Sequence, residues 1–156
     1  MMTLRPGVRI GVDVGRQRVG VAKTDPHGVL ASPVDTLPRD AAIDAIRQLA
    51  DEYEALEIVV GRPLGLSGHH TPSTDDAESF AQQLAAVVHA PVRILDERLS
   101  TVQASATLRQ QGHSSRAQRK IVDQAAAVII LQHSLESEAH SGVAAGQIVS
   151  RPEDDR

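Results

Sequence analysis

The chain of 156 residues has no cysteine, a net charge of −4, 41% apolar residues and 23% charged residues. These values fit one soluble domain with a sizeable core, and the lack of cysteine excludes disulfides, zinc–thiolate sites and cysteine nucleophiles. With one tyrosine and one phenylalanine, the core must be aliphatic, and nucleic-acid binding driven by aromatic stacking is not expected. No apolar run approaches the ~20 residues of a membrane span, and the N-terminus lacks a signal-peptide pattern, so we expect a cytoplasmic protein without membrane contact.

The first predicted element is an apolar hairpin that carries one acid. Residues 8–14 alternate with the period of two that is typical of a strand, and the pattern resumes after a break at residues 15–18. Asp13 stands where a core strand usually carries an apolar residue. Its carboxylate is costly to bury unpaired, so we expect it to meet a cation, a basic side chain or water. Gly11 and Gly20 beside it let a ligand or another backbone come close.

The remaining elements predict a mixed α/β sheet flanked by helices. A third strand is expected near a sheet edge, because Pro33 removes a donor from the ladder. Ser73 and Asp76 resemble a capping box at the start of a helix. The expected sheet has five strands, three antiparallel strands followed by parallel crossovers. The segments are strands at 8–14, 19–22, 29–37, 57–61 and 92–95, and helices at 40–54, 73–89, 100–112 and from 114 or 115 to about 131.

The C-terminal segment differs in composition from the rest. From residue 141 onward glycine, serine, proline and acids dominate, and such segments bury too little apolar surface to fold. We therefore expect one domain over residues 1–140 and a disordered tail over residues 141–156.

Three carboxylates interrupt apolar segments in well-separated parts of the chain. Asp13 lies in the first strand, Glu97 follows the fifth, and Asp123 lies on the last helix. Functional groups in open α/β sheets gather at the carboxyl ends of parallel strands, where Glu97 is predicted. Alanines at 125–127 would let the last helix lie close to the sheet and bring Asp123 to the same place. Such oxygen ligands suit Mg²⁺ or Mn²⁺, and paired ions ~4 Å apart can activate a water against a phosphodiester.

The same acids could instead have no catalytic role. Helical aspartates are mostly solvated, and Glu97 could be the ion-pair partner of a neighbouring arginine. Asp96 stands next to Glu97, but the alternation of a strand would point it to the other face. The histidines offer little: His69 and His70 lie side by side in a glycine-rich loop, and His113, His133 and His140 are scattered.

A basic segment lies between the last two acids. Residues 98–122 contain no acid, although the chain as a whole has a net charge of −4. Such a segment beside a carboxylate cluster would hold phosphates while the acids hold metal; the alternative is a solvated helix–loop–helix surface. Its basic residues are Arg98, Arg109, Arg116, Arg119 and Lys120.

Four segments, in the same order, resemble motifs of the YqgF/RuvX family. The segment Gly11–Ala22 (GVDVGRQRVGVA) resembles the opening motif, and Val60–Pro63 (VGRP) resembles the second. Asp96–Thr101 (DERLST) resembles the third, and Asp123–Gln132 (DQAAAVIILQ) resembles the fourth. Four motifs in register, spanning residues 10–132, form a specific signal.

The resemblance implies a ribonuclease H-like fold and a metal-dependent nuclease that hydrolyses phosphodiester bonds, with a role in 5′-end processing of pre-16S ribosomal RNA. It implies that Asp13, Glu97 and Asp123 are the catalytic acids and hold the metal, two Mg²⁺ or Mn²⁺ ions. It also implies that two arginines of the motifs, Arg18 and Arg98, lie near the site. Together with the basic segment, the expected substrate-binding residues are Arg18, Arg98, Arg109, Arg116, Arg119 and Lys120.

Two alternatives also bind nucleic acid, but they differ from the RNA nuclease in what they do to it. An enzyme of the same fold could resolve Holliday junctions, and a two-fold junction would favour a dimer that places two sites symmetrically. The chain could instead be a non-catalytic nucleic-acid-binding module, although acids at all three motif positions argue against it. Both a monomer and a homodimer are compatible with the sequence.

Overall fold

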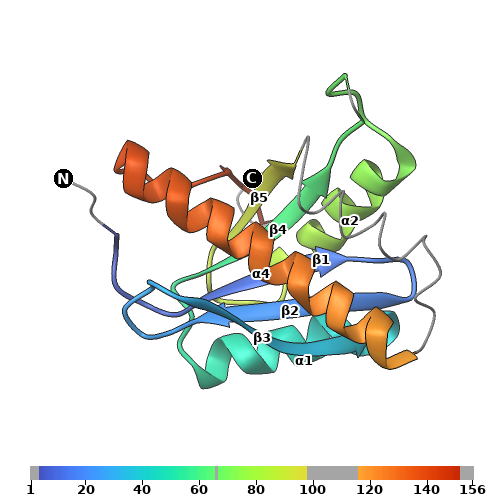
Figure 1. The fold of residues 1–156 in the computed structure, drawn as a ribbon, viewed down its shortest axis with the longest axis horizontal. Helices are drawn as coiled ribbons and strands as arrows, with labels where there is room; N and C mark the ends of the chain where they lie inside the picture. Colours follow the sequence, from blue (N-terminus) through green and yellow to red (C-terminus); the bar gives the residue numbers. More distant parts are fainter. Residues whose placement is uncertain (1–3, 66, 98–115, 152–156) are drawn as a thin grey trace.

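The structure is a six-stranded sheet with helices on both faces (Figure 1). The computed structural model describes residues 4–65, 67–97 and 116–151, and over 116–120 it describes the course of the helix alone. The order of strands across the sheet is β3-β2-β1-β4-β5-β6. The elements are β1 (Arg9–Val14), β2 (Arg18–Thr24), β3 (Ala31–Pro38), α1 (Arg39–Glu52), β4 (Glu57–Pro63), α2 (Pro72–Ala85), β5 (Val92–Glu97), α4 (Arg116–Ser141) and β6 (Gln147–Ile148).

The predicted mixed sheet is confirmed, with one strand more than expected. Strands β1, β2 and β3 pair in antiparallel fashion, β4 pairs in parallel with β1, and β5 pairs in parallel with β4. The additional strand, β6, pairs with β5 in antiparallel fashion at the far edge. The helix predicted over residues 100–112 lies outside the described residues. No helix in the described part of the chain is both long and apolar enough to span a membrane.

The prediction of a disordered tail from residue 141 is wrong for the part of it that the structure describes. The chain turns after α4 at Gly142 and Gly146, which both have φ of +79°, a conformation that glycine adopts at no steric cost. Ala145 is buried, and the backbone N–H of Val149 donates to the carbonyl of Val92. Two glycine turns and an open β5 edge therefore order a segment whose composition predicts disorder.

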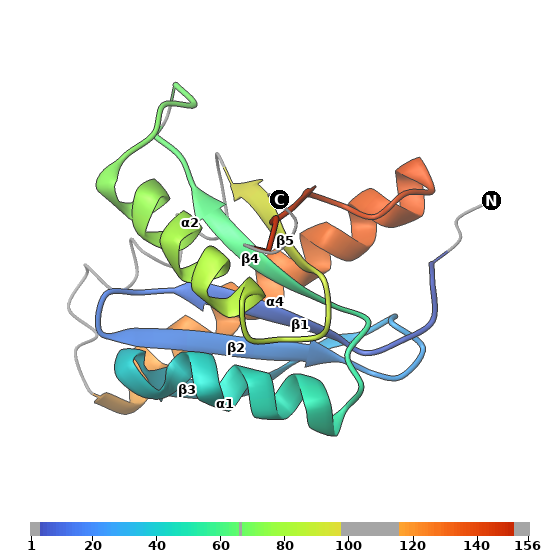
Figure 2. The ribbon, with the colours of Figure 1, turned by 180° about the vertical axis from the view of Figure 1, so that it is seen from behind.

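The alternation of side chains along the strands divides the core into two layers. Ile10, Val12 and Val60 belong to the larger layer, which packs against α1 and α2 (Figure 2). Ala22 and Val59 belong to a smaller layer beneath α4 on the opposite face. One face of the strands from β1 to β5 thus lies against α4, and the orientation of a residue in these strands follows from its position in the alternation.

The cap of α2 differs from the predicted one. Thr71 and Thr74 form the capping box, and Pro72 is the first helical residue. Proline at that position is favoured because its fixed φ suits the helix and the missing N–H has no helical partner there. The helix therefore begins one residue before Ser73, the residue predicted as the cap.

Two strand glycines let the backbone of α4 approach the sheet. A Cβ added at Gly20 would collide with the backbone oxygen of Asp123, and a Cβ at Gly11 would lie 2.8 Å from the backbone oxygen of Ala127. The interpretation that these glycines admit another backbone is confirmed, and that backbone is α4.

A third glycine continues this line of close contacts across the sheet. A Cβ at Gly61 on β4 would collide with the side chain of Ile130. The helix therefore crosses β2, β1 and β4 in turn, as its diagonal path over the sheet shows (Figure 1).

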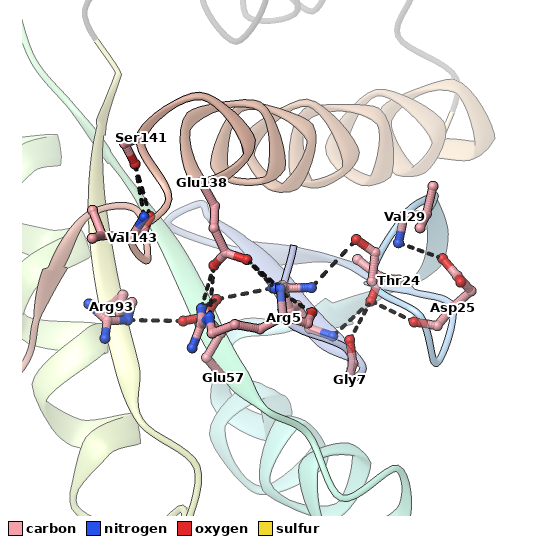
Figure 3. Close-up of polar contacts among 12 residues, drawn as sticks. Arg5, Gly7, Thr24, Asp25, Val29, Glu57, Arg93, Glu138, Ser141 and Val143 are labelled. Atoms are coloured by element: carbon pink, nitrogen blue, oxygen red, sulfur yellow. Dashed lines mark hydrogen bonds and ion pairs between the residues drawn. The ribbon is translucent and has the colours of Figure 1, made fainter. Parts of the chain in front are cut away.

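A buried group of charged residues joins the C-terminal half of α4 to the sheet (Figure 3). Arg9 on β1 is 0% exposed, and it donates to Glu138 at 2.6 Å and to Glu57 at 3.2 Å. Arg5 donates to the same two carboxylates, at 2.8 Å to Glu57 and at 3.0 Å through Nε to Glu138. Arg93 Nε lies 2.9 Å from Glu57 as an ion pair without hydrogen-bond geometry. The N-terminal segment, β4, β5 and α4 thus share one charged cluster.

Replacing Gly20 by alanine should destabilise the fold more than the same change at Gly61. At Gly20 the new methyl meets backbone, which cannot move without displacing α4, so we expect a loss of about 2–3 kcal/mol. At Gly61 it meets the flexible end of Ile130, which can adopt another rotamer, so we expect about 1 kcal/mol or less. Urea unfolding of both variants measures the difference, and equal losses would contradict the close backbone contact at Gly20.

Candidate active site

The three predicted acids lie on the same face of the sheet, at the edge where parallel strands end. Asp13 lies two residues after Gly11 on β1, on the same face of the strand, so its side chain faces α4. Its cross-strand partner is Gly20, which lies beneath the backbone of Asp123. Glu97, the last residue of β5, also faces α4, because it contacts a side chain of that helix. Strand, sheet edge and helix thus place the acids that sequence alone singled out on one side of the sheet.

Asp123 is held by an arginine from the hairpin. Its side chain is 6% exposed, and its Oδ2 accepts a hydrogen bond from Nε of Arg18 at 2.9 Å. Arg18 is the first residue of β2 and is 28% exposed. The structure therefore places Arg18 beside one of the acids, with part of its guanidinium open to solvent.

Glu97 has a partner that the sequence did not predict. Nδ1 of His133 lies 3.1 Å and 3.2 Å from the two carboxylate oxygens of Glu97. Burial raises the pKa of Glu97, His133 opposes that rise, and the nearby charge of Asp96 adds to it. His133 is ten residues after Asp123 on the same helix, so the acid on β5 meets a different part of α4 from the acid on β1.

A signal for His133 does exist in the sequence, once the path of α4 is known. Positions 123, 127, 130 and 133 follow the spacing of three to four residues that lies on one helix face. Ala127 and Ile130 are buried against the sheet at these positions. His133 is the next residue on that face, and it therefore meets the next strand, β5.

The carboxylates face a shared side of the sheet but are not gathered at one point. Asp13 on β1 and Glu97 on β5 are separated by β4 and offset by two residues along the strands, so their backbones are about 12 Å apart at the usual strand spacing and rise. Among the described residues, one group has all its ligand atoms within 4.8 Å, and it is His70, Asp75 and Glu78 at the start of α2. That group is largely exposed, and Glu78 in it already pairs with Arg62.

The donor chemistry of the three acids fits a hard divalent cation. Carboxylate oxygens are the ligands that Mg²⁺ and Mn²⁺ prefer. Glu97 and Asp123 are 7% and 6% exposed, and a raised pKa shows that burial disfavours the ionised form of Glu97. A cation would stabilise that ionised form. The residues present therefore fit the expected metal.

The predicted phosphate-binding residues are only partly located. Arg98 and Arg109 lie outside the described residues. Arg116, Arg119 and Lys120 lie on the first turns of α4, directly before Asp123, and their side chains are not described. Their role stays a prediction.

The turn between Asp13 and Arg18 is held by a residue that sequence reasoning missed. Arg39, the first residue of α1, donates to the carbonyl of Gly15 at 2.9 Å and forms two hydrogen bonds with Asp76 on α2. Its guanidinium carbon also lies 5.1 Å from the centre of the Phe80 ring. Nothing in the local pattern around Arg39 indicates these contacts, because its partners come from the turn between β1 and β2 and from α2.

Asp96 lies on the opposite face from Glu97, as the alternation predicts. Its carboxylate pairs with Arg62 of β4, which also pairs with Glu78 of α2. Asp96 is therefore part of an ion-pair group on the α2 face and contributes no ligand to the acids beneath α4.

The family model described as "RuvX: Holliday junction resolvase" matches residues 7–137. A "Putative pre-16S rRNA nuclease" of Clavibacter michiganensis subsp. michiganensis is 53% identical, over 95% of this chain and 94% of its own. A protein of the same name from Streptomyces avermitilis is 51% identical, over 94% of this chain and 96% of its own.

One solved structure supports the fold. Thermus thermophilus RuvC in complex with a Holliday junction substrate matches with a TM-score of 0.55 at 13% identity, over 92% of this chain and 99% of that chain. This likeness confirms the predicted ribonuclease H-like fold.

Replacing Glu97 by glutamine should raise the stability of the metal-free protein at neutral pH. Burial raises the pKa of Glu97 in the folded protein. The protonated carboxyl therefore stabilises the fold below the unfolded pKa, and this stabilisation is lost as pH rises through the folded pKa and the group ionises. Glutamine carries no charge to desolvate. In EDTA we expect Glu97→Gln to melt above the wild type at neutral pH, and the two melting temperatures to converge near about pH 4.

Asp76 supplies a control of opposite sign. The hydrogen bonds from Arg39 lower the pKa of Asp76, so its contribution is present above the unfolded pKa and is lost as pH falls. Asp76→Asn should therefore melt below the wild type at neutral pH, with a difference that shrinks in acid. If both variants melted above the wild type at neutral pH, or both melted below it, the opposite pKa shifts would be contradicted.

Proposed function

The chain belongs to the RuvX family, and we propose that it is a metal-dependent nuclease that hydrolyses phosphodiester bonds in structured RNA, with the precursor of 16S ribosomal RNA as its substrate. The observation that carries the proposal is the position of Asp13, Glu97 and Asp123 on the α4 face, at the edge where β1 and β5 end. The family match and the names of the relatives support the class of reaction and of substrate.

The acids have defined roles in this proposal. Asp13, Glu97 and Asp123 hold the divalent cations, Mg²⁺ or Mn²⁺. When bound, such ions lower the pKa of a water and stabilise the charge on the scissile phosphate and the leaving oxygen. A water oxygen then forms the new bond to phosphorus, the bond from phosphorus to the leaving oxygen breaks, and the water's protons pass to the leaving oxygen and to solvent.

The basic residues bind the nucleic-acid backbone. Arg18 fixes the carboxylate of Asp123 through Nε, and the exposed part of its guanidinium is available to a phosphate. The segment after Glu97 supplies the remaining contacts, which are sequence-independent and weaken as salt rises. Its members are Arg98, Arg109, Arg116, Arg119 and Lys120.

A second candidate substrate is a branched DNA. The description of the matching family as a Holliday junction resolvase favours it, whereas the names of relatives at more than 50% identity favour the ribosomal precursor. A junction has two symmetric strands to cut, so this alternative also requires a dimer with two sites.

The test compares the two substrates directly. A labelled pre-16S RNA fragment and a four-way DNA junction are incubated at physiological salt with Mg²⁺, Mn²⁺ or EDTA. We expect metal-dependent cleavage of the RNA, and we expect Asp13→Asn, Glu97→Gln and Asp123→Asn each to reduce it by about 100-fold or more, because each removes a charge from the metal site. The matched control is Asp96→Asn, a carboxylate adjacent to Glu97 that faces away from the site.

Each alternative gives a different result in this assay. Cleavage of the junction with an intact RNA supports the resolvase. Binding that persists in EDTA and in all three acid variants, without any metal-dependent product, supports a binding module. Wild-type rates in Asp13→Asn would remove that residue from the catalytic set.

A further inference from the structure

The contact between His133 and Glu97 joins the strand that ends in the acid to the helix above it. A single ring nitrogen, Nδ1, lies 3.1 Å from Oε1 and 3.2 Å from Oε2 of the carboxylate. A hydrogen bond between them requires the proton on Nδ1, because an ionised carboxylate can only accept. A donor shared almost equally by both oxygens fixes the rotation of the carboxylate as well as its position.

The backbone of α4 around His133 is held in place by buried neighbours on the helix. Ile130 and Leu131 are 1% and 0% exposed, and Ser134 is 2% exposed, so α4 is buried on both sides of His133. Gly61 leaves room for the side chain of Ile130 between α4 and β4. The side chain of His133 is itself 36% exposed, so the helix fixes its backbone while part of the ring is open to solvent.

The carboxylate depends on this contact. Glu97 is 7% exposed, and among the described residues His133 supplies the hydrogen bond to its carboxylate. A buried carboxylate that loses its donor either moves or becomes neutral.

We propose that His133 is a positioning residue that holds the Glu97 carboxylate in the orientation in which it binds a divalent cation. His133 acts through Glu97 and touches neither the cation nor the nucleic acid. The proposal rests on the proposed function, because it takes Glu97 as a metal ligand. Partners of metal-binding groups typically change metal affinity by about 10–100-fold when they are removed.

The test measures binding of Mn²⁺ to the full chain without nucleic acid, by the electron paramagnetic resonance signal of free Mn²⁺. We expect His133→Ala to weaken binding by about 10–100-fold. His133→Asn places an amide nitrogen near the position of Nδ1 and should restore affinity to within a few-fold of the wild type. The control is His140→Ala, an exposed histidine on the same helix, which should bind as the wild type does.

A double variant separates positioning from a general structural effect. If His133 acts through Glu97, then His133→Ala should have no further effect on Mn²⁺ binding in a Glu97→Gln background. An equal loss in both backgrounds, wild-type affinity in His133→Ala, or no rescue by the folded His133→Asn variant would each overturn the proposal.

Failure of the proposed function gives a different result. A wild type that binds Mn²⁺ through Glu97 and His133 but cuts neither RNA nor junction DNA contradicts the nuclease assignment alone. A wild type that binds no Mn²⁺ overturns both.

Discussion

The close approach of α4 to the sheet is the constraint on which the candidate site depends. Asp123 lies on a helix, whereas Asp13 lies on a strand, and they face the same space only because no side chain separates the two backbones at Gly20. Any larger residue there would lift the helix and displace its acid from the strand that carries the other. The same helix then continues over Gly11 to β4 and β5, so one rigid element sets the position of residues at both ends of the site.

The buried charged cluster acts at the other end of this helix. Glu138 accepts hydrogen bonds from Arg5 and Arg9, and these outweigh the effect of burial, so the pKa of Glu138 is lowered. Desolvation offsets most of the Coulombic gain in such clusters, so their net stabilisation is small. Losing Arg9 is nevertheless costly, about 3–5 kcal/mol, because Glu57 and Glu138 stay buried without their buried partner. The cluster therefore favours one register of α4 over shifted ones, and that register is the one that puts Asp123 over Gly20.

The sequence predicted the elements and acids that have a local or periodic signal. The alternation around Asp13 and the polar interruption of apolar segments at Glu97 and Asp123 identified residues that the fold does bring to one face. His133 could not be identified in this way, because its partner depends on the path of α4 across the sheet rather than on any local pattern. Arg39 was missed for the same reason, and β6 is two residues long, which is too short to show a period.

Glu97 differs from the other acids whose pKa is shifted within the described part of the chain. Asp76 and Glu138 face arginines, and the pKa of each is lowered. Glu97 faces a histidine, and burial raises its pKa. Glu97 is therefore held at a cost in stability. Such an arrangement is useful where a bound cation supplies compensating charge, in contrast to Asp123, which already has Arg18 as its partner.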